Sequence, residues 1–160
     1  MNIPPYCIES NGTIWGFWNM CREFTTSWGC NHTLNRLTKH FGKPDIAFGK
    51  TDGINKDIVT VDINAGVEPT YCNDWAEMEM FSDNQFDFGL WDPPYDKMYL
   101  KEYKEIWRCC KKLAILHTNI YPKPKNSRRV AMIAISYGYP KKMRCLQIFE
   151  KIIENAFSSK

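Results

Sequence analysis

Four consecutive residues, Asp92-Pro93-Pro94-Tyr95, combine side chains and backbone groups that could hold an amino group. Two successive prolines fix the backbone and remove two N–H donors, so the carbonyls around Pro93 and the Asp92 carboxylate form an acceptor-only pocket. Such a pocket suits an amino group that donates hydrogen bonds while its nitrogen attacks an electrophile. The Tyr95 ring offers a face for stacking a planar base. Taken alone, the tetrapeptide is equally well explained as a Pro-Pro turn that closes a strand.

Two further acidic residues stand near the ends of predicted strands upstream of this tetrapeptide. The β-branched, apolar run 58–63 predicts a buried strand that ends in Asp62, and a weaker strand over 70–74 ends in Asp74. The run 86–91 predicts a fourth strand that leads into the tetrapeptide. Because ligands of open α/β sheets bind at the carboxyl ends of strands, we expect the three acids to line one edge.

The remaining pattern predicts a mostly parallel sheet that is covered on both faces. Apolar residues at helical spacing indicate helices over 33–41 and 97–110. Continuously apolar runs indicate further strands at 45–48, 113–116, 130–136 and 145–149. The last two are separated by a short Gly/Pro segment, which is typical of an antiparallel hairpin. The chain then divides into an irregular, aromatic-rich N-terminal segment with a helix, 1–43, and an α/β core, 44–160.

In this context the sequence resembles the class I S-adenosylmethionine-dependent methyltransferases, and more narrowly the branch that methylates adenine N6 or cytosine N4 in DNA. The resemblance covers about residues 44–150. In that family the fourth strand ends in Asp, Asn or Ser followed by Pro-Pro and an aromatic residue, as in Asp92–Tyr95. The second and third strands end in acids, matched by Asp62 and Asp74. The fifth strand precedes a crossover and a hairpin of the sixth and seventh strands, as predicted here.

The resemblance implies an α/β fold with a Rossmann-like methyltransferase sheet, S-adenosylmethionine as cofactor, and methyl transfer to an exocyclic amino group, first of all adenine N6 in DNA. It implies catalytic roles for Asp92, Pro93, Pro94 and Tyr95. It also implies cofactor contacts from these residues: Gly49, Asp52, Gly53, Asp62, Asn64, Asp74 and Trp75. A base inside a duplex cannot reach such a pocket, so the target would be flipped out or taken from a single strand.

The glycine-containing loop after the first core strand departs from the family pattern. Only eight residues separate Gly53 from Asp62, too few for a helix and a return. Either the loop is rebuilt and residues 33–41 supply the helix, or the cofactor site is degenerate. The alternatives are therefore a nucleic-acid-binding module on a methyltransferase scaffold, or a methyltransferase for RNA or a small molecule.

Charge is divided unevenly along the chain, although the formal total is only +3. Residues 1–96 carry 6 basic and 14 acidic side chains, whereas residues 97–160 carry 15 basic and 4 acidic ones. We expect the acidic half to hold the cationic cofactor and the basic half to contact the phosphates of a nucleic acid, DNA first of all. Six residues are predicted to make these contacts at the edge that carries Asp92: Lys123, Lys125, Arg128, Arg129, Lys141 and Lys142.

Composition excludes several other classes of protein. A hydrophobic content of 44% argues against global disorder, and no apolar run approaches a membrane span, so no membrane partner is expected. Seven cysteines without a secretory signal predict reduced thiols and a cytoplasmic location. The spacing of Cys21, Cys30 and His32 is poor for zinc, so no metal site is predicted. His117 is interpreted as structural, and the Trp/Phe cluster at 15–28 as core. No oligomeric state follows from these data.

Overall fold

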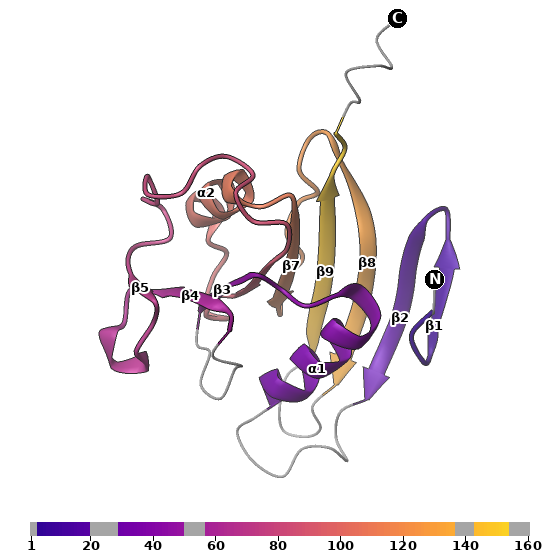
Figure 1. Ribbon diagram of the computed structural model, residues 1–160. Coiled ribbons are helices and arrows are strands. Elements are labelled where there is room, and N and C mark those ends of the chain that lie inside the picture. The colour runs from indigo at the N-terminus through magenta and orange to yellow at the C-terminus, as the bar shows by residue number, and fades with distance from the viewer. Residues whose placement is uncertain (1–2, 20–28, 50–56, 137–142, 154–160) are drawn as a thin grey trace, which may run out of the picture.

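Two α-helices and nine strands make up the regular structure of the residues that the computed structural model describes, 3–19, 29–49, 57–136 and 143–153 (Figure 1). Helices α1 (Gly29–Phe41) and α2 (Leu100–Cys109) lie where the sequence predicts them. No helix in these ranges is long and apolar enough to cross a membrane. The strands are β1 (Cys7–Ser10), β2 (Thr13–Asn19), β3 (Ile46–Gly49), β4 (Val59–Asp62), β5 (Tyr71–Cys72), β6 (Gly89–Asp92), β7 (Lys112–His117), β8 (Ser127–Ser136) and β9 (Arg144–Lys151).

All nine strands pair into one mixed sheet in the order β1-β2-β8-β9-β7-β6-β3-β4-β5. Strands β3 to β7 pair in parallel, and β9 lies antiparallel between β7 and β8. Counted from β3, this is the doubly wound order 3-2-1-4-5-6 with one antiparallel strand inserted before the last. The predicted α/β class and the antiparallel pairing of the last two strands are therefore confirmed, whereas the sheet as a whole is mixed and follows the Rossmann-like arrangement only in part.

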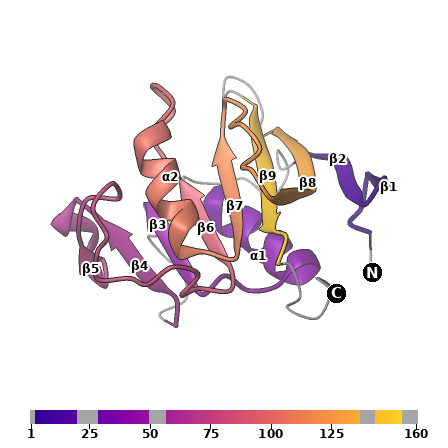
Figure 2. The same ribbon diagram turned by 90° about the horizontal axis from the view of Figure 1, so that it is seen from above.

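The sheet has a hydrophobic core on each face, one under α1 and one under α2, which lie on opposite sides (Figure 2). Along β3, Ile46 and Phe48 belong to the α2-side core, whereas Ala47 belongs to the α1-side core. This alternation follows from the two-residue period of a strand. Leu37 of α1 and Ile106 of α2 are both completely buried against the sheet.

Several connections between the core strands contain no α-helix among the described residues. A 3-10 turn (Ala65–Val67) joins β4 to β5, and the described connections β5–β6 and β7–β8 contain no α-helix. Arg108 of α2 instead holds the β5–β6 connection in place. Its guanidinium donates to the carbonyls of Met78 at 3.0 Å and Phe81 at 2.9 Å, and to the Asp83 carboxylate at 2.8 Å. This connection packs on α2 through side-chain contacts rather than as a helix of its own.

Residues 7–19 are not the irregular segment that the sequence predicts. They form a hairpin in which Ile8 of β1 pairs with Trp15 of β2, and β2 extends the sheet by pairing in parallel with β8. Ile14 and Trp18 are buried in the α1-side core, whereas Trp15 is 40% exposed. Burial along β2 has a two-residue period that is hard to recognise in so aromatic a segment. The segment forms a strand because it can pair with the edge of β8.

Candidate functional site

Three neighbouring parallel strands bring Gly49, Asp62 and Asp92 to one edge of the sheet. In the register Gly49 pairs with Asp92, and Phe48 pairs with Val61, the residue before Asp62. The residue preceding each member of this trio belongs to the α2-side core, so the trio itself is directed toward the α1 side. Because strands lie about 4.8 Å apart, the backbones of the two acids are about 10 Å apart, with glycine between them.

Gly49 keeps the space between the two acids clear of a side chain. Its φ of +122° is rarely adopted by other residues, and a Cβ placed on it would lie only 2.6 Å from the backbone oxygen of Asp92. Only glycine fits at this position without a shift of β3 or β6. The ends of β3 and β6 therefore approach each other closely beside the Asp92 carboxylate.

The turn Asp92-Pro93-Pro94-Tyr95 folds back on itself at the end of β6. The Tyr95 hydroxyl donates to Asp92 Oδ1 at 2.6 Å, and Pro93 is buried. This hydrogen bond orients the carboxylate, a group that accepts hydrogen bonds and donates none when ionised. Since neither proline has an N–H, the turn offers acceptors and no backbone donor at its two central positions.

His117, the last residue of β7, holds this turn from the neighbouring strand. It is completely buried, its Nδ1 accepts the backbone N–H of Asn119 at 2.8 Å, and its Nε2 lies 3.0 Å from the Pro94 carbonyl oxygen. Because Nδ1 accepts a hydrogen bond, the ring proton is on Nε2, which donates to Pro94. The ring also packs edge-on against Tyr95, with centroids 5.5 Å apart. Both ring nitrogens are engaged, which confirms the structural interpretation of His117.

Arg144, the first residue of β9, covers the Tyr95 ring. Its guanidinium carbon lies 4.3 Å from the ring centroid, within the range of a cation–π interaction. The antiparallel pairing of β9 with β7 places Cys145 opposite His117, so β9 begins at the edge where β6 and β7 end. A cationic side chain therefore lies directly beside the acceptor turn.

The start of α2 is tied to the connection that follows β7. The backbone N–H of Tyr99 donates to the Tyr121 hydroxyl at 3.0 Å, and the Tyr103 hydroxyl donates to the Pro122 carbonyl at 2.8 Å. Burial raises the pKa of Tyr103 above its ordinary value, so this hydroxyl stays a donor. These bonds hold the segment between Tyr95 and α2 from a second side, which stiffens the turn.

Asp62 and Asn64 shape the loop that follows β4. Asp62 Oδ1 accepts the N–H of Asn64 at 2.9 Å, and Asn64 Oδ1 accepts the N–H of Gly66 at 2.9 Å. The second carboxylate oxygen of Asp62 accepts no hydrogen bond from the described residues. Asp62 therefore has one oxygen that orients its own loop and one that can accept a hydroxyl donor.

Asp74 and Trp75 follow β5 and differ in what they contact. Asp74 is exposed, and its Oδ1 accepts the N–H of Ala76 at 2.9 Å. Trp75 is half-buried: its indole N–H donates to the Val61 carbonyl at 2.9 Å, and its ring meets Trp91 edge-on with centroids 6.2 Å apart. Trp75 thus packs on the α2-side core and braces the end of β4.

The segment that carries Arg128 and Arg129 begins β8 at the opposite edge from Asp92, so its predicted place beside Asp92 is wrong. Arg128 pairs with Glu150, and Glu150 in turn pairs with Lys112 at the amino end of β7. Asp92 stands instead at the carboxyl end of β6, which is parallel to β7. The reason is topological: β7 and β8 run in the same direction, so their connection must return across the sheet before β8 begins.

Most basic side chains at that opposite edge have partners of their own. Arg128 donates to Glu150 Oε2 at 2.7 Å, and the ammonium group of Lys123 donates to the Ser127 carbonyl at 2.9 Å. Lys125 is exposed. These contacts tie together the ends of β8 and β9 and the connection before them, well away from the acceptor turn.

Several predicted residues lie outside the described ranges: Asp52, Gly53, Lys141 and Lys142. Cys21 and the side chains of Cys30 and His32 also lie outside the described ranges, so the absence of a zinc site at these residues stays a prediction. Within the described part of the chain, no group of three or more His, Cys, Asp or Glu side chains could hold a metal ion.

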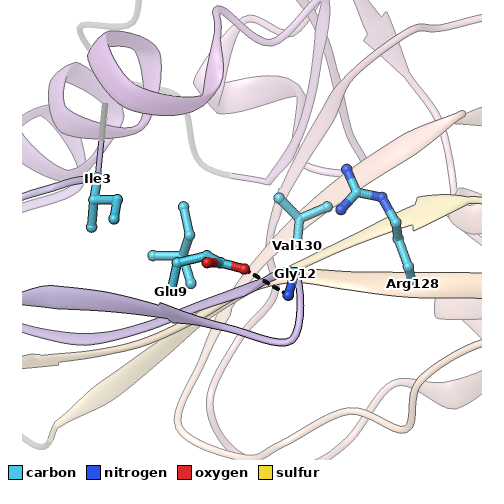
Figure 3. Close-up of a pocket in the computed structure, with 6 residues that line it drawn as sticks. Ile3, Glu9, Gly12, Arg128 and Val130 are labelled. Carbon is cyan, nitrogen blue, oxygen red and sulfur yellow. Dashed lines mark hydrogen bonds between the residues drawn. The ribbon is translucent and has the colours of Figure 1, made fainter. Parts of the chain in front are cut away.

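A half-open pocket of about 290 Å³ lies near the β1–β2 turn and the first residues of β8, away from the three strand ends (Figure 3). Its lining residues are Ile3, Glu9, Gly12, Ile14, Arg128 and Val130. The Glu9 carboxylate already accepts the Gly12 N–H at 2.8 Å, and Arg128 is paired with Glu150. The pocket therefore offers no unpartnered charge for a ligand among the described residues.

Comparison with known proteins gives likeness only at the level of structure. No protein-family profile and no curated protein matches the chain. Among solved structures, a SAM-dependent methyltransferase from Aquifex aeolicus is similar, with a TM-score of 0.43 and 12% sequence identity over 68% of this chain and 81% of that one. A likeness of this size says nothing about the substrate.

Proposed function

We propose that this protein transfers a methyl group from S-adenosylmethionine to an exocyclic amino group of a nucleic-acid base, in the first place adenine N6 in DNA. The observation that supports this best is the edge formed by Asp62, Gly49 and Asp92. Two acids stand at the carboxyl ends of neighbouring parallel strands around a bare glycine, and the second acid opens an acceptor-only Pro-Pro turn. This strand order binds ligands at that same edge in doubly wound sheets.

The residues present fit the proposed cofactor. The unengaged oxygen of Asp62 suits the hydroxyls of a ribose, and Gly49 places no side chain beside it at the end of β3. Asp74 would lie toward the adenine end, as the family resemblance implies. Trp75, which was expected to contact the cofactor, packs against Trp91 and donates its indole N–H to β4. When bound, S-adenosylmethionine supplies a methyl group attached to a positively charged sulfur.

The acceptor turn would position the amino group. The Asp92 carboxylate and the Pro93 carbonyl would accept the two N–H donors of the amino group, which localises the nitrogen lone pair and aligns it for attack. The Tyr95 hydroxyl orients the carboxylate, while His117 holds the turn through Pro94. Preorganised acceptors of this kind would stabilise the charge that develops on the nitrogen as its bond to the methyl group forms and the methyl–sulfur bond breaks, leaving a neutral thioether, and one amino proton would then pass to solvent.

A nucleic-acid base fits the turn better than a small amine. The Tyr95 ring is partly exposed and has a guanidinium, Arg144, over it, which joins a stacking surface to a cation at one place. DNA and the adenine N6 position rest on the Asp-Pro-Pro-Tyr resemblance, and RNA substrates are the alternative to be tested.

The test combines cofactor binding with methyl transfer. Isothermal titration calorimetry with S-adenosylmethionine is expected to show one site per chain. Transfer of labelled methyl groups to a single-stranded oligonucleotide is expected to require adenine and to fall about 1,000-fold in Asp92→Ala, since one preorganised group of this kind contributes about 100- to 1,000-fold.

Asp96→Ala is the matched control, because Asp96 is exposed and its carboxylate accepts from Tyr99 rather than from the turn. Transfer by that variant should remain within twofold of wild type. Absence of cofactor binding together with retained DNA binding would support the cofactor-free nucleic-acid module instead. Equal transfer by Asp92→Ala and wild type would also overturn the proposal.

A further inference from the structure

Trp15 and Phe17 of β2 form an exposed aromatic strip on the sheet. They are 40% and 42% exposed, and they lie two residues apart on one face of the strand, so their backbones are about 7 Å apart. Trp15 has exposed Ile8 opposite it on β1 and half-buried Met132 opposite it on β8. The Trp/Phe cluster at 15–28 was predicted to be core, but the rings of Trp15 and Phe17 face solvent.

The strip lies on the α2 side of the sheet, but neither α2 nor the connection after β7 covers it. Met132 pairs with Gln147, and Gln147 pairs with Ile115 of the α2-side core, so all three share a face with Trp15. The connection after β7 covers β9 through Gln147, which accepts the N–H of Tyr121 and donates to the Asn119 carbonyl. Figure 2 shows α2 on the far side of β7 from β8 and β2, and Trp15 and Phe17 remain exposed.

A cation stands beside the strip. The guanidinium carbon of Arg129 lies 5.8 Å from the centroid of Trp15 and 5.9 Å from that of Phe149. Among the described residues its Nε has no hydrogen-bond partner. The nearby Glu150 carboxylate is paired with Arg128 and not with Arg129. Aromatic faces with an adjoining arginine are complementary to stacked bases joined by phosphates, whereas an apolar protein partner would leave this charge buried and unmatched.

We propose that this strip, Trp15 and Phe17 with Arg129, is a binding surface for single-stranded DNA. Bases would stack on the two rings, and the Arg129 guanidinium would contact a phosphate. The prediction that Arg129 binds phosphate is thus retained at a different place, on the sheet face instead of on a loop beside Asp92.

β2, which carries the strip on the α2 side of the sheet, ends at the edge that carries the acceptor turn. β2 ends level with β8, and β8 ends beside the first residues of β9, where Arg144 covers Tyr95. Four strand spacings separate β2 from β6, which is about 19 Å. To reach from the strip to the Asp92 carboxylate, which is directed toward the α1 side, a single strand would pass over this edge from one face of the sheet to the other. Only this last step, delivery of a base to the turn, rests on the proposed methyltransferase function.

The experiment measures binding of a fluorescent single-stranded DNA oligonucleotide by anisotropy, with no cofactor present. Trp15→Ala and Phe17→Ala are each expected to weaken binding about tenfold, and the double variant about 100-fold, because each stacked base is removed separately. Trp15→Phe, which keeps a stacking face, should recover most of the affinity. Arg129→Gln should reduce the slope of log affinity against log salt by about one.

Ile8→Ala is the matched control for apolar area, because Ile8 is exposed on the same face but cannot stack on a base. It should bind DNA like wild type. Equal affinity of wild type and the double variant would overturn the proposal. So would tenfold preference for an RNA oligonucleotide, or sedimentation showing a dimer that Trp15→Ala and Ile8→Ala disrupt alike, which would assign the face to a second copy of the chain.

The two proposals fail separately. Variants of the strip should bind S-adenosylmethionine normally in calorimetry, and Asp96→Ala, which lies outside both sites, should bind cofactor and oligonucleotide like wild type. If wild type does not bind S-adenosylmethionine, the methyltransferase proposal fails and the DNA-binding proposal stands. If the strip variants bind DNA like wild type, the DNA-binding proposal fails and the methyltransferase proposal stands. Melting curves of the variants identify any that fail to fold.

Discussion

Two tryptophans on the same face of the sheet have opposite surroundings. Trp91 of β6 is completely buried by Trp75, Tyr103 and Tyr121, which come from α2 and from the connections beside it. Trp15 of β2 is 40% exposed because no described element covers its part of that face. What covers a strand, and not the residue type, decides whether an indole becomes core or binding surface.

The same comparison extends to the two flanks of the sheet. The covered flank, β4-β3-β6-β7, buries both faces and presents acids at its carboxyl edge. The open flank, β8-β2-β1, buries only its α1 face and presents aromatic rings beside arginine. We infer a division of work in which the covered flank holds cofactor and amino group, and the open flank holds the strand of DNA. The following predictions test that division.

Arg108→Met should have the largest effect, a loss of about 3 kcal/mol in the free energy of unfolding. The guanidinium bonds two backbone carbonyls and two carboxylates, and hydrogen bonds to a charged group are each worth about 1.5–3 kcal/mol when truncated. Urea denaturation measures the loss. Lys104→Met, an exposed change on the same helix, should stay within about 0.5 kcal/mol of wild type. A small loss for Arg108→Met would show that the covered flank does not depend on this side chain.

Asp62→Ala should weaken S-adenosylmethionine binding about 50-fold and leave oligonucleotide binding unchanged. A charged acceptor for ribose hydroxyls is removed from the covered flank, and about 2 kcal/mol of binding free energy goes with it. Calorimetry and anisotropy measure the two affinities. Parallel losses in both would break the proposed division between the flanks.

Gly49→Ala should destabilise the protein by about 2 kcal/mol and abolish detectable cofactor binding. The new Cβ meets the Asp92 backbone oxygen at 2.6 Å in addition to the strain of a positive φ. Gly42→Ala separates the two causes, because Gly42 also has a positive φ, +99°, but nothing within 4 Å of a Cβ. Equal losses in the two variants would mean that the close approach to Asp92 has no consequence.

His117→Asn should lower the rate constant of methyl transfer about tenfold while leaving the KM for S-adenosylmethionine unchanged. The Pro94 carbonyl loses its donor from β7, so the acceptor turn is held less firmly, but no cofactor contact is removed. His117→Gln, whose longer amide can reach toward the carbonyl, should recover part of the rate. A rise in KM with no change in rate would contradict a positioning role.

The smallest expected effect concerns pH. The Arg108 hydrogen bond lowers the pKa of Glu105, so this carboxylate stabilises the fold above the ordinary glutamate pKa, and the contribution is lost as pH falls through the lowered value. Glu105→Gln should therefore be about 1 kcal/mol less stable than wild type at pH 7, and the difference should shrink below about pH 4. A difference that is constant over this range would exclude the carboxylate as its source.

The sequence predicted both helices, the buried strands and the acceptor turn, because each leaves a local pattern: helical spacing in 33–41, apolar runs, and two prolines after Asp92. It could not show that 7–19 form a hairpin, since the period of β2 matters only once β8 offers an edge. It also could not place Arg128, because residues adjacent in the chain can stand at opposite edges of a sheet.

Local chemistry, then, was determined by the sequence alone: acids at the ends of apolar strands, an acceptor-only Pro-Pro turn, and a chain with an acidic and a basic half. Tertiary structure alone decided which of these meet. Strand order placed Gly49 between two acids, the direction of β9 brought Arg144 onto Tyr95, and the missing cover over β2 left Trp15 exposed. The physical reason is that the chemistry of a side chain is a property of that residue alone. Strand register, strand direction and burial depend instead on partners distant in the chain.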